Sequence, residues 1–276
     1  MQKQALTIDV EDYFQVSAFA KNINIDDWDS LESRVEMNTN RLLDLFESHN
    51  AKATFFMLGW VAKKFPELTR RIVKDGHELG SHGMLHQLAS LQTPKEFQTD
   101  VGDTKRLLED IVGDNVIKGY RAPSFSFTKS NLWVYDILKK EGYRYSSSVY
   151  PVVHDHYGIP DAPRSRYTTE SGIDEIPLST LKIMGKNMPI SGGGYFRLYP
   201  YFLTRWAIKR FTNQEENAYI FYMHPWEIDP EQPRVEGISL KSRFRHYLNL
   251  SRTEKRLSKM LSDFEWSSMA ELYGYK

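Results

Sequence analysis

The sequence predicts an α/β fold with a largely parallel sheet. Short apolar runs alternate with segments of helical periodicity along most of the 276 residues, which is typical of repeated strand–helix units. Several apolar runs also end in polar clusters, such as residues 9–12 and 224–227. Because the active sites of α/β proteins form at the carboxyl ends of strands, these clusters are candidates for one shared site.

The expected strands are apolar, β-rich segments, and the expected helices lie between them. The strands are residues 5–10, 53–58, 78–81, 117–120, 143–147, 174–178 and 218–223. The helices are residues 40–48, 60–74 apart from Pro66, 94–112, 129–141 and 199–213. Residues 93–96 and 251–254 both have the form of a capping box, which predicts that helices begin at Pro94 and near Ser251.

Composition limits the class of protein. Hydrophobic residues make up 41% and charged residues 26%, which indicates a globular chain. The 36 basic and 36 acidic residues cancel, so the sequence lacks the basic excess of a general nucleic-acid binder. Without cysteines, any bound metal must be held by histidine and carboxylate side chains.

The chain shows no linker, no internal repeat and no run of 18 apolar residues. We therefore expect one domain over residues 1–276, with a core at about 5–229 and a helical extension at 230–276, and no transmembrane helix. The first apolar run starts at Ala5, which leaves no room for a signal peptide, so a cytoplasmic location is expected. The sequence does not predict an oligomeric state.

His82 and His86 are the leading candidates for metal ligands. Two histidines four residues apart can direct their rings at one ion. An isolated pair is more often an ordinary surface or core pair, and we assign no metal role to the pair His154 and His156. Neighbouring glycines and the end of a strand distinguish His82 and His86. A carboxylate from residues 9–12 would complete a three-ligand site, unless those residues form a solvated acidic turn.

Arg121 and His224 also follow predicted strands. Pro123 fixes the turn after Arg121 and would hold Arg121 and the Ser124 N–H in set directions. Trp226, just after His224, would supply an apolar wall suited to a sugar ring. Taken singly, either could be an ordinary surface arginine or core histidine. Together with a metal, they are the parts of a metal-assisted hydrolase.

In this order, the clusters resemble the polysaccharide deacetylase family, the NodB-homology group of carbohydrate esterases. The resemblance is carried by residues 76–86, 119–123 and 221–224. Residues 7–12, 192–197 and 224–229 resemble a subgroup found with bacterial exopolysaccharide and exosortase loci. The resemblance implies a distorted (β/α) barrel that binds a divalent metal, usually Zn²⁺, with Co²⁺ or Ni²⁺ as alternatives. It implies hydrolysis of an N-acetyl group on an amino sugar of a polysaccharide or its precursor, with release of acetate.

The resemblance also implies roles for single residues. Asp9 would be the general base and Arg121 would pair with it. His82 and His86 would hold the metal, and His224 would be the general acid. The residues expected at the substrate are Ser124, whose N–H would share the oxyanion with the metal, and Pro123, Tyr195 and Trp226.

The metal carboxylate is the first point at which the sequence departs from the family. The family has adjacent aspartates, but here Val10 follows Asp9, so the ligand is Glu11 or Asp12. A regular strand would direct Glu11 to the same side as Asp9, whereas a bend after the strand would favour Asp12. We prefer Asp12 and retain both.

Two further departures affect the surroundings of the site. Gly83 replaces a serine or threonine, so a hydroxyl that stabilises the loop is lost. Ser146 replaces the aspartate that orients the catalytic histidine, so Glu175, Glu227 or Asp229 would have to take that part.

Other functions remain open at this point. One is hydrolysis of a different C–N bond, in a small amide, cyclic amide or formyl sugar. Another is a catalytically weak carbohydrate-binding relic, which the changes at Gly83 and Ser146 favour. A cytoplasmic enzyme would act on a lipid-linked or nucleotide-linked precursor. A basic patch near the C-terminus could bind such a precursor or could be a solvated helical cap; it comprises Arg234, Lys241, Arg243, Arg245 and His246.

Overall fold

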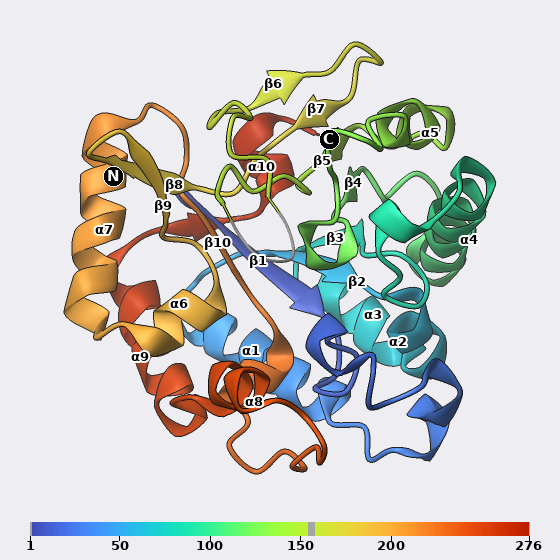
Figure 1. Ribbon diagram of the computed structural model, residues 1–276, viewed down its shortest axis with the longest axis horizontal. Coiled ribbons are helices and arrows are strands. Elements are labelled where there is room, and N and C mark those ends of the chain that lie inside the picture. Colours follow the sequence, from blue (N-terminus) through green and yellow to red (C-terminus); the bar gives the residue numbers. More distant parts are fainter. Residues whose placement is uncertain (1, 154–157, 276) are drawn as a thin grey trace.

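The computed structural model describes residues 2–153 and 158–275 (Figure 1). Within these residues the strands are β1 (Gln4–Val10), β2 (Thr54–Met57), β3 (Glu78–Ser81), β4 (Gly119–Tyr120), β5 (Tyr145–Ser146), β6 (Tyr167–Thr168), β7 (Asp174–Glu175), β8 (Thr180–Ile183), β9 (Lys186–Pro189), β10 (Ile220–Met223) and β11 (Trp266–Ser267). The helices are α1 (Val35–Ser48), α2 (Gly59–Lys64), α3 (Pro66–Lys74), α4 (Pro94–Val112), α5 (Val134–Lys140), α6 (Gly193–Leu198), α7 (Tyr201–Gln214), α8 (Leu240–Tyr247), α9 (Leu250–Asp263) and α10 (Met269–Tyr273). His154 and His156 lie outside the described residues.

One curled sheet organises the molecule. Its strand order is β10-β1-β2-β3-β4-β5-β7-β6, and β11 also pairs with β1. All of these pairs are parallel except β6–β7. Helices surround the sheet in Figure 1, and β8 and β9 form a separate hairpin. This arrangement confirms the predicted distorted (β/α) barrel.

The register of the strands brings their carboxyl ends to one edge. Val10 pairs with Met57, Met57 with Ser81, and Ser81 with Tyr120. On the other side of β1, which is buried along its whole length, Ile8 pairs with Met223. The polar residues that directly follow β1, β3, β4 and β10 therefore emerge at the same edge of the sheet.

Local signals fixed several helix ends. The capping box at α4 is formed, because Thr93 Oγ1 accepts the Glu96 N–H at 3.3 Å and Glu96 accepts the Thr93 N–H at 2.8 Å. Pro66 divides the expected helix 60–74 into α2 and α3. Phe65 before it is non-helical (φ −129°, ψ 65°), as expected for a residue that precedes proline.

The second predicted capping box is wrong. Helix α9 begins one residue earlier, at Leu250, and its N-cap is Asn249 in the left-handed conformation (φ 54°, ψ 24°). Ser251 therefore lies inside the first turn. The sequence patterns also did not predict β6, the β8–β9 hairpin, α6, α8, α10 or β11.

The C-terminal segment is built into the sheet. Strand β11 pairs with β1 through Gln4↔Trp266 and Ala5↔Ser267. Helix α9 packs on α6 and on the short 3-10 helix Pro225–Ile228 that follows β10. Within the described part of the chain, no helix combines the length and the apolar character that crossing a bilayer requires.

Candidate active site

Four loops at the carboxyl edge of the sheet supply the candidate site. Glu11, His82, Arg121 and His224 are each the first residue after β1, β3, β4 and β10. Asp9 lies on β1 itself, one residue before its end. The structure thus gathers residues from four separate parts of the sequence, as the polar strand ends predict.

Glu11, His82 and His86 form the candidate metal centre. One ligand atom from each of the three lies within 4.8 Å of the others. The Nδ1–H of His82 donates to the Arg121 carbonyl at 2.8 Å, which leaves the lone pair on Nε2 of His82. Oε2 of Glu11 lies 2.7 Å from Nε2 of His86 without a hydrogen-bond geometry. A buried, unpaired oxygen beside two ring nitrogens is a donor set that fits a divalent cation.

The ionisation states of these ligands also suit a cation. Burial acts to raise the pKa of Glu11, but His86 and His224 outweigh it and lower the pKa to about 2. Burial lowers the pKa of His82 to about 4, so this ring is neutral at pH 7. A carboxylate and a neutral imidazole are the forms that coordinate metals.

Asp12 does not lie in this cluster. The sequence-based preference for Asp12 over Glu11 as the metal carboxylate is therefore corrected. Oδ1 of Asp12 accepts the Tyr13 N–H at 2.9 Å. Its Oδ2 accepts from the Ser33 hydroxyl at 2.7 Å and from the N–H groups of Arg34 and Val35 at 2.8 and 3.1 Å. Asp12 thus satisfies the free N–H groups at the start of α1.

A tight turn explains why Glu11 is directed at the histidines instead. The Glu11 N–H donates to the Asp9 carbonyl at 3.0 Å, so the chain bends directly after β1. A bend was expected to direct Asp12 at the histidines, but this bend places Asp12 at the start of α1. The Glu11 side chain lies on the same side as Asp9 and is directed at the candidate metal centre.

Asp9 is held by a fully buried arginine. Nη1 of Arg121 lies 2.8 Å from Oδ1 of Asp9 and 2.7 Å from the Thr7 hydroxyl. The Ser147 carbonyl and hydroxyl each accept from Arg121 at 3.0 Å, and the guanidinium lies over the Phe56 ring at 4.3 Å. The structure brings together the Asp9–Arg121 pair that the motifs predict, and it adds Thr7 and Ser147, to which sequence patterns assigned no role.

Of the three carboxylates considered as partners of His224, Glu227 is the one that lies beside it. Its Oε1 lies 2.9 Å from Nδ1 of His224 and accepts the His224 N–H at 3.0 Å. Nε2 of His224 lies 3.4 Å from Oε1 of Glu11. Burial acts to lower the pKa of His224, but the Glu11 and Glu227 carboxylates outweigh it and raise the pKa to about 9.

The two other candidates for this place have different partners. Glu175 accepts the N–H groups of Ser148 and Val149 at 2.8 and 2.9 Å. Asp229 pairs with Arg34 at 2.5 Å. Both carboxylates therefore support the fold at a distance from the His224 ring.

Arg197 and Gly193 hold Glu227 in position. Nε of Arg197 donates to Oε2 of Glu227 at 2.7 Å. Its Nη1 donates to the carbonyls of His246 and Leu248 at 2.8 and 2.9 Å. A Cβ at Gly193 would lie 2.1 Å from both Glu227 carboxylate oxygens, so only glycine fits there. Sequence patterns assigned no role to Arg197. The three glycines shortly before it are the one local signal that could have indicated a close approach of the backbone here.

Pro123 and Ser124 lie in the loop that follows β4. Ser124 adopts the left-handed conformation (φ 51°, ψ 28°), and Pro123 is buried at the start of the same short helix. The Ser124 hydroxyl lies 2.7 Å from that of Ser17, which is 3.5 Å from Nδ1 of His86. Ser17, which the motifs did not mark, therefore links Ser124 to His86 of the candidate metal centre.

The two aromatic residues expected at the substrate differ in position. Tyr195 is half-buried on α6 and stacks on Tyr199 at 6.4 Å. Trp226 is only 5% exposed, stacks on His224 at 5.2 Å and on His246 at 4.1 Å, and lies 3.4 Å from Glu11. The expectation that Trp226 forms an open wall for a sugar is therefore corrected, because its ring is covered and supports His224.

Asp100 stabilises the loop that carries Gly83. The Met84 N–H donates to Oδ1 of Asp100 at 2.7 Å. Gly83 has a φ of 77°, and a Cβ there would lie 2.9 Å from Oδ2 of Asp100. The loop between His82 and His86 is thus fixed from α4, which no sequence pattern indicated.

Comparisons with known proteins agree with this architecture. Residues 22–146 match the polysaccharide deacetylase family model, and residues 147–274 match a domain of unknown function (DUF3473). A solved structure of a Mycobacterium smegmatis protein assigned to the polysaccharide deacetylases is similar in fold. Its TM-score is 0.62 at 16% identity, and the match covers 99% of this chain and 90% of that one.

Two curated relatives match a shorter part of the chain. A peptidoglycan-N-acetylglucosamine deacetylase of Bacillus cereus is 32% identical over 106 residues, which are 38% of this chain and 47% of the relative. A chitooligosaccharide deacetylase of Azorhizobium caulinodans is 28% identical over 106 residues, or 38% and 49% of the two chains. The chain thus spans about half the length of these relatives.

Proposed function

The chain carries a polysaccharide deacetylase domain over residues 22–146, and from this premise we propose that it is a metal-dependent hydrolase of N-acetylated amino sugars. The observation that carries the proposal is the convergence of three units at one sheet edge. They are the Glu11–His82–His86 cluster, the Asp9–Arg121 pair and the His224–Glu227 pair. A ligand set, a held carboxylate and a held histidine are what metal-assisted amide hydrolysis requires.

Glu11, His82 and His86 are the proposed metal ligands. Two imidazole nitrogens and one carboxylate oxygen suit Zn²⁺, and Co²⁺ or Ni²⁺ would accept the same donors. When bound, the cation would polarise the acetamide carbonyl and lower the pKa of water at the site. The side chains around the ligands then determine where protons are taken up and released.

Asp9 is the proposed general base, which accepts a proton from the attacking water while Arg121 holds it in position. The Ser124 N–H is the proposed donor to the oxyanion. His224 would donate its proton to the leaving nitrogen as the C–N bond breaks, and Glu227 would orient its ring. Water adds to the carbonyl carbon, and the products are acetate and a free amino sugar.

The substrate proposed is an N-acetylhexosamine unit of a bacterial polysaccharide or of its precursor. The names of the two curated relatives specify peptidoglycan N-acetylglucosamine and chitooligosaccharides, and both are built from N-acetylated hexosamines. Attachment of the substrate to a nucleotide or lipid remains a prediction. The cytoplasmic location expected from the sequence also stays a prediction, which cell fractionation tests.

Acetate release tests the proposal. The metal-loaded protein should release acetate from chitooligosaccharides or peptidoglycan fragments, and the isosteric variant Asp9→Asn should be at least about 100-fold slower because the base is lost. Turnover of small amides or formyl sugars alone would favour a different C–N hydrolase. Sugar binding without turnover, unchanged in His82→Ala, would favour a non-catalytic carbohydrate-binding protein.

A further inference from the structure

An apolar surface lies beside the candidate site. It consists of residues at the end of α6, on the first turns of α7 and on α8, which we call the α7–α8 surface. Its large apolar side chains and their exposed fractions are Leu198 (45%), Tyr199 (38%), Phe202 (68%), Leu203 (40%), Trp206 (48%), Leu240 (84%) and Phe244 (58%). Single exposed apolar residues are ordinary, but this many large ones on neighbouring helices indicate an interaction site.

Hydrogen bonds join the α6–α7 segment to α8. Nη1 of Arg197 on α6 donates to the carbonyls of His246 and Leu248 at the end of α8, and Asn249 returns a hydrogen bond of 2.8 Å to the Arg197 carbonyl. Tyr195 on α6 stacks on Tyr199 at 6.4 Å. In Figure 1, α6, the start of α7 and α8 lie together in the lower left part of the molecule.

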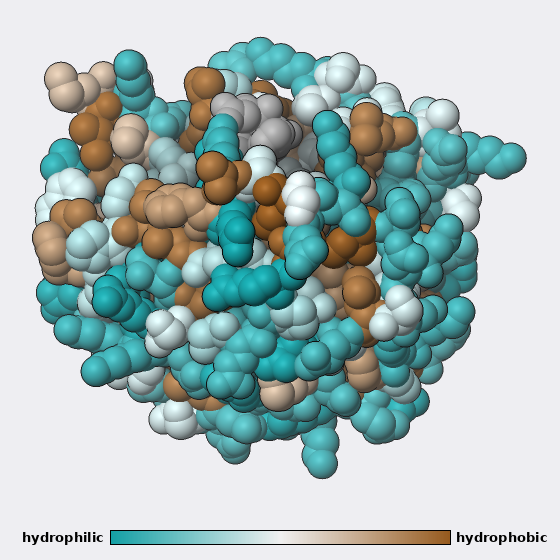
Figure 2. Space-filling view, turned by 60° about the horizontal axis from the view of Figure 1, so that its bottom comes forward, coloured by the Kyte–Doolittle hydropathy of each residue, from teal (hydrophilic) through white to brown (hydrophobic). Residues whose placement is uncertain are grey.

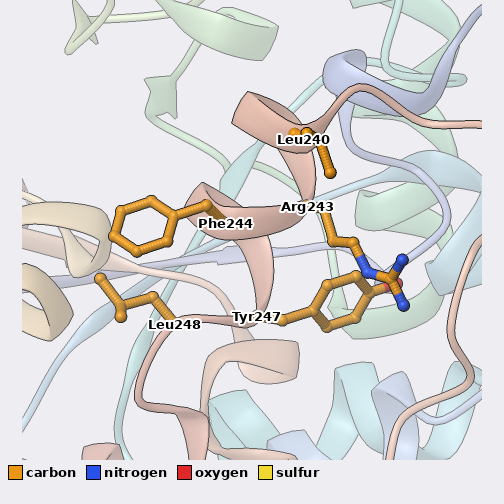
Figure 3. Close-up of a pocket in the computed structure, with 5 residues that line it drawn as sticks. All are labelled: Leu240, Arg243, Phe244, Tyr247 and Leu248. Atoms are coloured by element: carbon orange, nitrogen blue, oxygen red, sulfur yellow. The ribbon is translucent and has the colours of Figure 1, made fainter.

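Helix α8 presents its apolar residues along one stripe. Leu240 and Phe244 are four residues apart and therefore lie on the same side of the helix, and Leu248 follows directly after its last residue. Together with Arg243 and Tyr247 they line a shallow hollow, and Figure 3 shows Phe244 and Leu248 on the opposite side from Arg243 and Tyr247. The stripe is thus flanked by a cation on the same helix.

Positive charge is concentrated on the same helices. Helix α7 carries Arg205, Lys209 and Arg210, and α8 carries Lys241, Arg243 and Arg245, whereas neither helix contains an aspartate or glutamate. The complete chain has equal numbers of basic and acidic residues, so these two helices stand out. Figure 2 shows brown side chains interspersed with teal ones on the left side of this face, where α7 lies.

We propose that the α7–α8 surface binds the face of a lipid bilayer that contains anionic phospholipid. Leucine and phenylalanine side chains would enter the boundary between headgroups and acyl chains, and the flanking cations would lie against the lipid phosphates. Exposed apolar residues bordered by arginine and lysine, without acidic residues, are the pattern of helices that lie in the plane of a membrane. A second copy of this surface fits less well, because the cations of α7 and α8 on each copy would face one another, although one of them, Arg205, is paired with Asp263 at 3.0 Å.

The position of the surface gives this binding a consequence for the site. Arg197 connects α8 to Glu227 and hence to His224. Binding through α8 and the start of α7 would hold the carboxyl edge of the sheet close to the bilayer. The proposal goes beyond the proposed function, since the chain could bind lipid whether or not it deacetylates sugars.

Sedimentation with vesicles tests the proposal. The full chain should co-sediment with vesicles of phosphatidylcholine and phosphatidylglycerol, less with phosphatidylcholine alone, and less at high salt. The variants Leu240→Ser/Phe244→Ser and Arg243→Glu/Arg245→Glu should each lower the partition coefficient about tenfold or more. Leu91→Ser is the matched control, because Leu91 is 80% exposed outside this surface, and it should bind as the unchanged protein does.

Trp206 provides a second readout, because its fluorescence can be followed in the unchanged protein. Trp28, Trp226 and Trp266 are at most 5% exposed and Trp60 and Trp133 are partly buried outside this surface, whereas Trp206 is 48% exposed. Brominated lipid should therefore quench the fluorescence of the unchanged protein, and Trp206→Phe should remove most of that quenching. Equal binding to neutral and anionic vesicles, or binding that all variants retain, would overturn the proposal. Self-association that the α8 variants abolish, without vesicle binding, would overturn it in favour of a second copy.

Discussion

Glu227 accepts from Nδ1 of His224 at 2.9 Å and is itself bound by Arg197 at 2.7 Å. Its oxygens are therefore fixed from both sides in a buried setting. A carboxylate in this position selects the ring tautomer and orients the ring. If His224 is the general acid that we propose, Glu227 would take the orienting part that the resemblance gives to an aspartate at Ser146.

We expect Glu227→Gln to lower kcat for N-acetyl sugars about 100-fold, with little change in KM, because protonation of the leaving amine is impaired. Hydrolysis of p-nitrophenyl acetate should fall much less, since its leaving group needs no proton. Steady-state kinetics with both substrates measure the difference. Asp229→Asn is the control, because Asp229 pairs with Arg34 instead. Equal losses on both substrates would refute an orienting role.

Five residues that the sequence motifs singled out lie at the same edge of the sheet: Asp9, His82, His86, Arg121 and His224. They could not decide between Glu11 and Asp12, because the answer depends on the turn made by the Glu11 N–H and the Asp9 carbonyl. They also could not mark Arg197, whose partner is 30 residues away in sequence. Contacts of this kind follow from tertiary structure rather than local pattern.

At the scale of elements, the first turn of α6 packs directly on the candidate acid–base pair. Gly193 leaves no room for a Cβ beside Glu227, whereas nothing lies within 4 Å of a Cβ built at the next residue, Gly194. The two adjacent glycines therefore form a matched pair. Substituting each of them by alanine distinguishes a steric clash with the Glu227 carboxylate from the general effect of replacing a helical glycine.

Gly193→Ala should destabilise the protein by about 1–3 kcal/mol through overpacking and should lower deacetylation by displacing Glu227. Gly194→Ala should be neutral or stabilise by about 0.5–1 kcal/mol, since alanine favours the helix. Urea unfolding and activity assays measure the two effects. Similar behaviour of both variants would show that the Gly193 contact does not matter.

His77, just before β3, gives the fold a dependence on pH. Its Nδ1 accepts the Ala53 N–H at 3.1 Å and its ring packs on Phe55 at 5.2 Å. Burial lowers the pKa of His77 from 6.5 to about 4. Because the folded pKa is the lower one, the stabilisation is complete above pH 6.5 and is lost as the pH falls towards 4.

The free energy of unfolding should therefore decrease by up to about 3 kcal/mol between these pH values on account of His77. His77→Gln, which keeps an acceptor but does not titrate, should show a flatter dependence. Urea unfolding at a series of pH values measures both curves. Parallel curves for the two proteins would mean that His77 is not the group responsible.

Elements with local signals were predicted best. Helix α4 has the boundaries that its capping box indicates, and β3 was predicted to the residue. Strand β11 and the β8–β9 hairpin are short and take their form from their partners, so their sequences carry little periodicity. The helix start predicted at Ser251 is wrong, because α9 already begins at Leu250 with Asn249, in the left-handed conformation, as its N-cap.

Across the whole molecule, the two matched regions share one sheet, because β7 from residues 147–274 pairs with β5 from residues 22–146. Strands β10 and β11, also from residues 147–274, pair with β1, which precedes both matched regions. Glu11 and His224 of the candidate site also come from opposite sides of residue 146. The single domain expected from the sequence remains a prediction, and the shared sheet supports it.

We expect residues 1–146 alone to fail to fold, because β1 would lose its pairs with β10 and β11 and its apolar faces would be exposed. The complete chain should unfold in one cooperative transition. Circular dichroism and calorimetry of both chains measure this. A native-like, cooperatively melting fragment would show instead that the two matched regions are separate domains.

Everything proposed for the site depends on whether Glu11, His82 and His86 hold a divalent cation. The most direct measurement is the zinc content and affinity of the purified protein, beside Glu11→Gln, Asp12→Asn and His82→Ala/His86→Ala. We expect about one ion per chain in the unchanged protein and in Asp12→Asn, an affinity lowered about 100-fold or more in Glu11→Gln, and no bound ion in the double variant. No binding of Zn²⁺, Co²⁺ or Ni²⁺ by the unchanged protein, or loss of binding in Asp12→Asn with retention in Glu11→Gln, would contradict the proposed metal site.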